Sequence, residues 1–202
     1  MVSGAEVLVT GGNGFIGAHL VRELASPEAG NKVTVMDLKS GPGTTGGDLG
    51  LAELDNVEII DGTVLDPSDL DQLPLDFDHI VHAAGFLGIK QVAEQQATTL
   101  DVNVMGTRNL LDFAAKHPKK PHVIYFSTSE IYGIESAGPT EEHPVVIPSS
   151  GDRWCYAASK VAGEYYLRAY AQSEGITGNI VRPFNVFGPH RYGTNAMTSL
   201  VS

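Results

Sequence analysis

A glycine-rich turn near the start of the chain restricts the fold more than any other feature. Glu6–Thr10 (EVLVT) is a short apolar run typical of a buried strand, and T-G-G-N-G-F-I-G follows it at Thr10–Gly17. Apolar residues then recur near helical spacing through Gly14–Leu24. This order of strand, glycine turn and helix predicts a unit that binds the pyrophosphate of a dinucleotide at the helix N-terminus.

The three spaced glycines of this turn have distinct expected roles. Gly11 permits the tight turn, Gly14 lets the backbone approach a pyrophosphate, and Gly17 lets the helix pack closely on the strand. The spacing is G-x-x-G-x-x-G rather than G-x-G-x-x-G, and either pattern alone is weak evidence. The position of the turn between a strand and a helix favours a ligand site over a plain structural turn.

Strands and helices alternate through the rest of the chain. The further predicted strands are Lys32–Asp37, Val57–Ile60, Asp78–Ala83, His122–Ser127 and Gly178–Arg182. The further helices are Cys155–Ser173 and Thr99–Lys116, the latter with Leu100, Val104, Leu110, Leu111 and Ala114 on its apolar side. Ser40–Leu49 is predicted to be a loop because it is rich in Gly, Thr and Pro. We therefore expect one α/β domain over residues 1–202, a Rossmann-type doubly wound parallel sheet with helices on both faces.

Charge and cysteine content narrow the partners and the compartment. A net charge of −11 argues against nucleic acid or an anionic membrane surface as a partner. Cys155 is the single cysteine and cannot form an internal disulfide, which favours the cytoplasm. No secretory signal, no membrane span of about 20 apolar residues and no metal-ligand spacing of histidines is found, so neither a membrane nor a metal is expected.

Asp37 ends the second predicted strand, 20 residues after Gly17. An acidic residue at this place accepts hydrogen bonds from the adenosine ribose and repels a 2′-phosphate. The sequence therefore predicts NAD over NADP. Lys39 is close enough to soften this preference.

Tyr156 and Lys160 lie in Y-A-A-S-K, a spacing that puts both on one face of a helix. Tyrosine in water has a pKa near ~10, and a nearby ammonium together with a positive nicotinamide ring is expected to lower it. Such a pair occurs by chance on many helices. Here Ser127-Thr128-Ser129-Glu130 ends the fifth strand at the ligand-binding edge, where Thr128 can share a proton with Tyr156 and Glu130 is a candidate second acid or base.

Seven segments in a fixed order resemble the extended short-chain dehydrogenase/reductase family, in its nucleotide-sugar epimerase/dehydratase branch. They are T-G-G-N-G-F-I-G, Asp37, H-A-A-G (His82–Gly85), N-V-x-G-T (Asn103–Thr107), S-T-S-E-I-Y-G (Ser127–Gly133), Y-A-A-S-K and R-P-F-N-V-F-G-P (Arg182–Pro189). The resemblance covers essentially the whole chain. It implies an NAD-dependent enzyme with Tyr156 as redox base, Lys160 as its electrostatic partner and Thr128 as its hydroxyl partner.

The resemblance also implies the remaining site residues. The NAD-binding set is Gly11, Asn13, Gly14, Phe15, Ile16, Gly17, Asp37, Leu38, Thr63, Val64, Ala83, Ala84, Gly85, Asn103, Ser127, Tyr156, Lys160 and Pro183, and the substrate-binding set is Ser129, Glu130, Phe184 and Asn185. One departure concerns adenine. Family members often have G-D-x-x-D after the third strand, whereas this chain has G-T-V-L-D, so Thr63 replaces a carboxylate and Asp61 or Asp66 is the candidate substitute.

The expected substrate is a nucleotide-diphosphate sugar. Tyr156 would take the proton of the sugar C4 hydroxyl while hydride passes to NAD, and the 4-keto sugar would then lose CO₂ or water. Thr128-Ser129-Glu130 resembles uronate decarboxylases and some 4,6-dehydratases, and Arg153-Trp154 is nearest to UDP-glucuronate decarboxylases. A 4-epimerase is the third alternative. A non-catalytic NAD-binding sensor or scaffold is the alternative from another class, and the presence of Tyr156, Lys160 and Thr128 together argues against it.

Two expectations concern the whole protein. The chain stops soon after Arg182–Pro189, so the sequence is expected to be truncated before most of a small C-terminal substrate domain. The resemblance also implies a homodimer, formed through the helix that carries Tyr156 and the Thr99–Lys116 helix.

Overall fold

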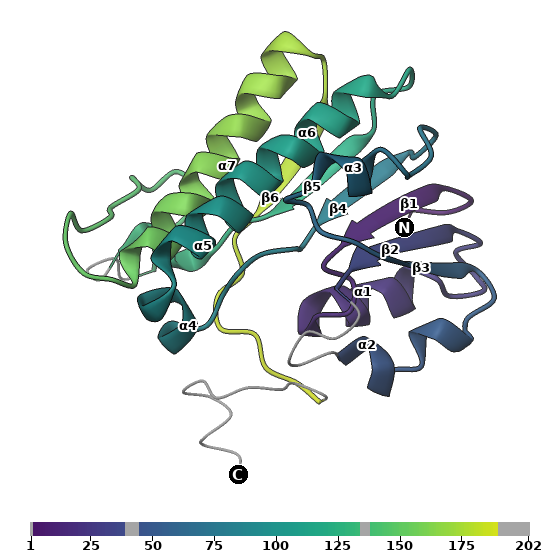
Figure 1. The fold of residues 1–202 in the computed structure, drawn as a ribbon, viewed down its shortest axis with the longest axis horizontal. Helices are drawn as coiled ribbons and strands as arrows, with labels where there is room; N and C mark the ends of the chain where they lie inside the picture. The colour runs from purple at the N-terminus through teal and green to yellow at the C-terminus, as the bar shows by residue number, and fades with distance from the viewer. Residues whose placement is uncertain (1, 39–44, 134–137, 190–202) are drawn as a thin grey trace.

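Six parallel strands form one sheet at the centre of the molecule (Figure 1). The computed structural model describes residues 2–38, 45–133 and 138–189. The strands are β1 (Glu6–Thr10), β2 (Lys32–Asp37), β3 (Val57–Asp61), β4 (His79–His82), β5 (His122–Phe126) and β6 (Thr177–Val181). Their spatial order is β3-β2-β1-β4-β5-β6, and every pairing is parallel. The predicted Rossmann-type sheet is confirmed, and strand order reverses between β1 and β4, where such sheets bind ligands.

Helices cover both faces of the sheet (Figure 1). The helices α1 (Phe15–Leu24) and α2 (Thr45–Asp48) lie on one face. The other face carries α3 (Pro67–Leu70), α6 (Gly106–Lys116) and α7 (Trp154–Ser173), and the short helices α4 (Ile89–Glu94) and α5 (Gln96–Leu100) lie at its lower end. Among the described residues, no helix is long and apolar enough to cross a membrane.

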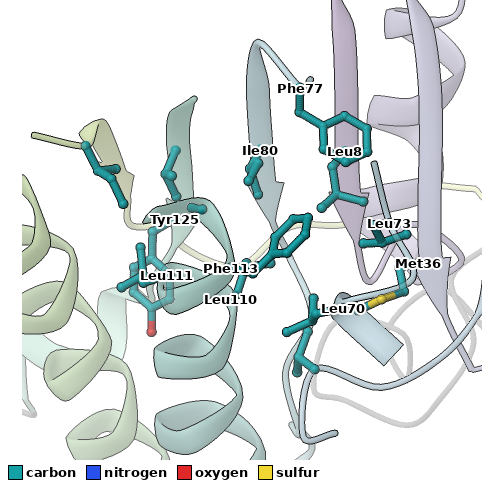
Figure 2. Packing of buried hydrophobic residues seen from close by; sticks show 14 of the residues in the cluster. Leu8, Met36, Leu70, Leu73, Phe77, Ile80, Leu110, Leu111, Phe113 and Tyr125 are labelled. Carbon is teal, nitrogen blue, oxygen red and sulfur yellow. The ribbon is translucent and has the colours of Figure 1, made fainter. Parts of the chain in front are cut away.

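Successive side chains of β1 point to opposite faces of the sheet and so contribute to two separate layers of the apolar core. Leu8 packs with residues of α6 and α7, whereas Val7 and Val9 pack on the opposite face with α1. Figure 2 shows the first layer, in which Leu110 and Phe113 of α6 point toward the strands. Because both faces are buried, the strands β1 and β2 are almost continuously apolar, as parallel sheets require.

The prediction of a loop over 40–49 is wrong for its second half. Thr45–Asp48 forms α2, and residues 39–44, which include Lys39, lie outside the described residues. Thr45 is buried, and the Gly46 N–H donates to the carbonyl of Asn13 at 3.0 Å. Contact with the glycine turn therefore overrides the low helix propensity of two adjacent glycines.

The predicted helix Thr99–Lys116 is not uniform. It consists of the end of α5, a π-helical turn over Asp101–Met105, and α6. A π turn inserts one residue and rotates the helix face. Leu100, predicted to lie on the apolar side, is 41% exposed for this reason, whereas Leu110 and Leu111 are buried as expected.

The chain after β6 crosses the carboxyl edge of the sheet. The Ser129 N–H donates to the carbonyl of Pro183 at 3.0 Å, and Gly188 lies against the ring of Phe15 at the start of α1. The segment 183–188 therefore links the end of β5 to the glycine turn. It brings the predicted cofactor and substrate residues to one edge.

Candidate active site

The glycine turn connects β1 to α1 and packs against the segment that follows β4. Gly11 has φ +75°, and a Cβ there would lie 2.5 Å from the Ala84 nitrogen. A Cβ on Gly17 would lie 2.2 Å from the carbonyl oxygen of Gly11. Both distances are far below contact, so only glycine fits at either position. The turn is therefore packed directly against Ala83–Gly85, the segment predicted to line the cofactor.

Gly14 differs from the other two glycines. It is the N-cap of α1 in an extended conformation, and no side chain caps this N-terminus within the described part of the chain. A Cβ on Gly14 would meet only the carbonyl oxygen of Gly11, at 3.3 Å, among the described atoms outside its immediate neighbours. The helix N-terminus thus faces open space beside a bare backbone, which fits the pyrophosphate of a dinucleotide.

Asp37 is tied to the same turn. Its Oδ2 accepts a hydrogen bond from the Asn13 N–H at 2.8 Å, and its Oδ1 accepts from the Leu38 N–H at 2.8 Å. Burial raises the pKa of Asp37, and the N–H groups of Asn13, Leu38 and Gly14 oppose that rise. The carboxylate therefore has a fixed position at the end of β2, where an adenosine ribose would lie.

Asn103 links the segment after β4 to α7 from within the π-helical turn. Its Oδ1 accepts from the Phe86 N–H at 2.8 Å, and its Nδ2 donates to the Phe86 carbonyl at 3.1 Å and to Ser159 Oγ at 3.0 Å. The amide is 1% exposed. Asn103, predicted to lie near the cofactor, therefore uses its amide to hold the protein chain beside Gly85.

Lys160 lies under the same segment. It is 4% exposed, and its Nζ donates to the Phe126 carbonyl at 2.9 Å and lies 5.2 Å from the Tyr125 ring centre. A Cβ on Gly85 would lie 3.2 Å from this Nζ. Burial lowers the pKa of Lys160 to about 8, so the ammonium form still predominates at neutral pH.

Tyr156 of α7 lies beside Thr128 and Glu130, which follow the end of β5. Burial and, to a smaller extent, the charge of Glu130 raise its pKa to about 12, and Thr128 opposes this rise. The lowered pKa expected from Lys160 is therefore not found in this structure. The reason is geometric, because the Lys160 ammonium donates to the Phe126 carbonyl on the adjacent strand and does not contribute to the shift.

Thr128 and Glu130 begin a single 3-10 turn, Ser129–Tyr132, directly after β5. Thr128 Oγ1 accepts from the Glu130 N–H at 3.3 Å and lies close enough to Tyr156 to oppose the rise in the tyrosine pKa. Glu130 Oε2 lies 3.5 Å from Arg153 Nη2. One turn thus holds a hydroxyl and a carboxylate beside the tyrosine.

A cavity of about 320 Å³ opens beside this turn. All four predicted substrate residues line it. The complete lining is Ser129, Glu130, Tyr132, Gly133, Pro139, Arg153, Trp154, Phe184 and Asn185. Phe184, 59% exposed, stacks on the Tyr132 ring at 6.3 Å between centres, so these two aromatic rings form one wall.

The segment after β3 is less suited to its predicted role. Val64 is buried in the core, and a Cβ on Gly106 would lie 2.5 Å from its Cγ2, so its side chain faces the protein interior. Asp66 accepts from the Ser68 N–H and hydroxyl at 2.9 and 2.7 Å. Asp66 caps α3, which argues against it as the substitute for the missing adenine carboxylate. The Thr63 hydroxyl is also engaged within the protein, because it accepts from the Leu65 N–H.

Sequence patterns did not identify a buried ion pair behind the cavity. Glu164 on α7, 1% exposed, pairs with Arg182 at the end of β6, and Arg182 also donates to the Tyr132 hydroxyl at 2.9 Å. Burial raises the pKa of Glu164, but Arg182, Ser127 and Arg168 together bring it below its usual value. The only signal in the sequence was the spacing of Glu164 one helical turn after Lys160.

This fold and site define a Rossmann-type dinucleotide-binding protein with a tyrosine–lysine pair at its ligand edge. The model of the NAD dependent epimerase/dehydratase family matches residues 7–202, and the chain belongs to that family, within the extended short-chain dehydrogenases/reductases. The family is NAD-dependent, in agreement with the cofactor predicted from Asp37.

Characterised relatives carry out different reactions. The chain is 36% identical over 184 residues to a UDP-N-acetyl-alpha-D-glucosaminuronate decarboxylase of Bacillus cytotoxicus, covering 90% of this chain and 54% of that protein. It is 31% identical over 191 residues to a dTDP-glucose 4,6-dehydratase of Streptomyces niveus, covering 93% and 55%. The chain therefore spans little more than half the length of these relatives.

A solved structure supports the same assignment. UDP-glucuronic acid 4-epimerase from Bacillus cereus, in complex with UDP-glucuronic acid and NAD, superposes with a TM-score of 0.80 at 31% identity, covering 92% of this chain and 58% of that one. Decarboxylase, dehydratase and epimerase are thus all represented among similar proteins. The family alone does not select the reaction.

Proposed function

We propose that this chain forms the NAD-binding and catalytic part of a nucleotide-sugar enzyme that oxidises the C4 hydroxyl of the sugar. The observation that carries the proposal is the grouping of Tyr156, Thr128 and Glu130 at the carboxyl edge of the sheet, beside the end of β5. Bound NAD would supply the oxidant that takes up hydride from C4. The glycine turn and Asp37 would hold it, and Lys160 and Gly85 would contact its nicotinamide end.

The protein residues divide the proton chemistry. Tyr156 would accept the C4 hydroxyl proton, and the neighbouring Thr128 hydroxyl would hydrogen-bond the same C4 oxygen and hold it in line. Lys160, with its pKa of about 8, would carry the positive charge that stabilises a phenolate once its ammonium shifts from the Phe126 carbonyl. Lys160 is buried and Tyr156 is partly buried, so water has limited access to these contacts.

The second step would be decarboxylation or dehydration. A 4-keto sugar makes the neighbouring C5–H acidic and makes a C6 carboxylate a β-keto acid, which loses CO₂ readily. Glu130 is placed beside Tyr156 and can move a proton at C5 in either case. Epimerisation is the alternative, because it would need only rotation of the keto sugar, return of the hydride from the reduced cofactor to C4 and return of the proton from Tyr156, with no second acid.

The test is a product analysis with the protein at its natural length. NAD and a panel of UDP-, dTDP- and GDP-sugars are supplied, and the products are identified by mass. Loss of CO₂ indicates decarboxylation, loss of water indicates dehydration, and an unchanged mass with altered mobility indicates epimerisation. Binding of NAD without conversion of any sugar would favour the sensor or scaffold and contradict the proposal.

Two further proposals concern the state of the protein. We propose a homodimer through α6 and α7, where Tyr165 is 65% exposed and Met105, before α6, is 42% exposed. A monomer by light scattering contradicts it. We also propose a cytoplasmic location, because the single Cys155 is only partly buried and its thiol is compatible with a reducing compartment.

A further inference from the structure

Arg153 is the only cationic residue among those that line the cavity beside Glu130, counting described residues. It precedes α7 directly, and its side chain is 51% exposed. Its guanidinium lies 4.9 Å from the centre of the Trp154 ring, which also lines the cavity. Stacking on an aromatic face restricts the guanidinium at low cost in hydrogen-bonding capacity.

The guanidinium N–H groups of Arg153 are available to bind a ligand. Its one polar contact is with Glu130 at 3.5 Å, which is longer than a usual N–H···O hydrogen bond, and its guanidinium makes no other polar contact with the described residues. Arg182 is a useful contrast, because it donates to Glu164, Tyr132 and the Glu141 carbonyl. Arg153 therefore retains a planar set of donors that suits a carboxylate.

The position of Arg153 relative to Tyr156 fits one end of a hexose. Glu130 contacts Arg153 on one side and acts electrostatically on Tyr156 on the other. In a hexose, C6 is only two bonds from C4, whereas the nucleotide diphosphate is attached at the far side of the ring, at C1. A sugar with its C4 hydroxyl at Tyr156 thus extends its C6 group toward Glu130 and Arg153.

We propose that Arg153 binds the C6 carboxylate of a uronic-acid sugar and so selects nucleotide-linked uronates over neutral hexoses. The inference rests on the proposed function, since it takes C4 to lie at Tyr156. In the free protein Glu130 partly neutralises Arg153 across 3.5 Å. The substrate carboxylate replaces Glu130 as the partner of the guanidinium, which leaves Glu130 directed at the neighbouring C5.

The experiment measures binding without turnover. Tyr156→Phe protein at its natural length, saturated with NAD, is titrated with UDP-glucuronate and with UDP-glucose. Arg153→Gln in this background is expected to weaken UDP-glucuronate about tenfold or more, as loss of a charge-assisted contact does, and to leave UDP-glucose unchanged. Arg22→Gln, which removes a charge on the exposed side of α1, is the matched control and changes neither affinity.

A second variant is expected to change the affinity for UDP-glucuronate in the opposite direction. Glu130→Gln frees Arg153 and removes a like charge, so it is expected to tighten UDP-glucuronate and to leave UDP-glucose unaffected. Equal weakening of both sugars by Arg153→Gln would assign the arginine to the diphosphate and overturn the proposal, as would no weakening or a parent protein that prefers UDP-glucose. A parent protein that binds neither sugar, with no product from the wider panel, would contradict the proposed function as well.

Discussion

Arg182 and Glu164 form a two-point ion pair between the end of β6 and the middle of α7. Arg182 Nε donates to Glu164 Oε1 at 2.8 Å, and Nη2 donates to Oε2 at 2.6 Å. The same arginine donates to the Tyr132 hydroxyl, and Tyr132 stacks on Phe184 in the cavity wall. The helix that carries Tyr156 and Lys160 is thereby fixed to the substrate side of the site.

Replacing Arg182 by methionine is expected to destabilise the fold by about 3 kcal/mol, because Glu164 is left buried without its main partner. Urea unfolding measures the change. Arg108→Met is the control, since Arg108 and Asp112 form an exposed pair with 51% of each side chain accessible, and its loss changes stability by less than about 1 kcal/mol. Similar losses for the two variants would contradict the importance assigned to the buried pair.

Gly17→Ala is expected to weaken NAD binding about tenfold or more. The new Cβ would lie 2.2 Å from the Gly11 carbonyl, so the turn must move away from the N-terminus of α1. NAD titration followed by fluorescence measures it. Gly47→Ala has open space around its Cβ among the described atoms and serves as the control, with NAD affinity unchanged.

Asp37→Asn is expected to shift cofactor preference toward NADP by about tenfold or more, because a negative charge beside the expected 2′-phosphate is removed. The amide oxygen can still accept from the Asn13 or Leu38 N–H. Parallel titrations with NAD and NADP measure the shift, and Glu58→Gln on the exposed side of β3 controls for net charge. Equal affinity of the unmodified protein for the two cofactors is the result that opposes this role.

Buried His82 is expected to make the free energy of unfolding fall as the pH is lowered. It accepts from Thr10 and donates to Thr107, and burial, with a smaller contribution from the Lys160 charge, lowers its pKa from 6.5 to about 3. Below pH 6.5 the unfolded chain binds a proton at His82 that the folded protein does not bind. The contribution of neutral His82 to the free energy of unfolding is therefore complete above pH 6.5 and is lost as the pH falls toward 3. At pH 5 the loss is about 2 kcal/mol.

Urea unfolding at pH 7.5 and pH 5 checks this dependence. His82→Gln is expected to flatten the profile, whereas His143→Gln, on an exposed loop, leaves it unaltered. His117 is also buried with a lowered pKa, so some acid sensitivity remains in the His82 variant. An unchanged slope after His82→Gln would rule out this explanation.

Features encoded in neighbouring residues were predictable from the sequence. The strands differ from prediction by a residue at most at each end, because each is a short apolar run between turn signals. The glycine turn was equally clear, since the conformation of Gly11 and the close contact of Gly17 leave no alternative residue. The doubly wound parallel sheet was likewise predictable, because strands alternate with helices along the chain.

Features that depend on packing across the chain were not predictable. The pairing of Glu164 with Arg182 joins residues with no shared motif, and the rotation of Leu100 to the surface depends on a π turn. The pKa of Tyr156 was predicted to fall because of a nearby ammonium together with a positive nicotinamide ring, but in the protein alone burial and Glu130 raise it. Distance and burial decide such effects, and neither is written in residue spacing.

The central claim is that Tyr156 is the group that takes the C4 proton. The most direct measurement compares unmodified protein at its natural length with Tyr156→Phe, supplied with NAD and the sugar that the product panel identifies. Turnover is expected to fall by about 10²- to 10⁴-fold while NAD affinity stays within about twofold. Unchanged turnover in the phenylalanine variant would contradict the account.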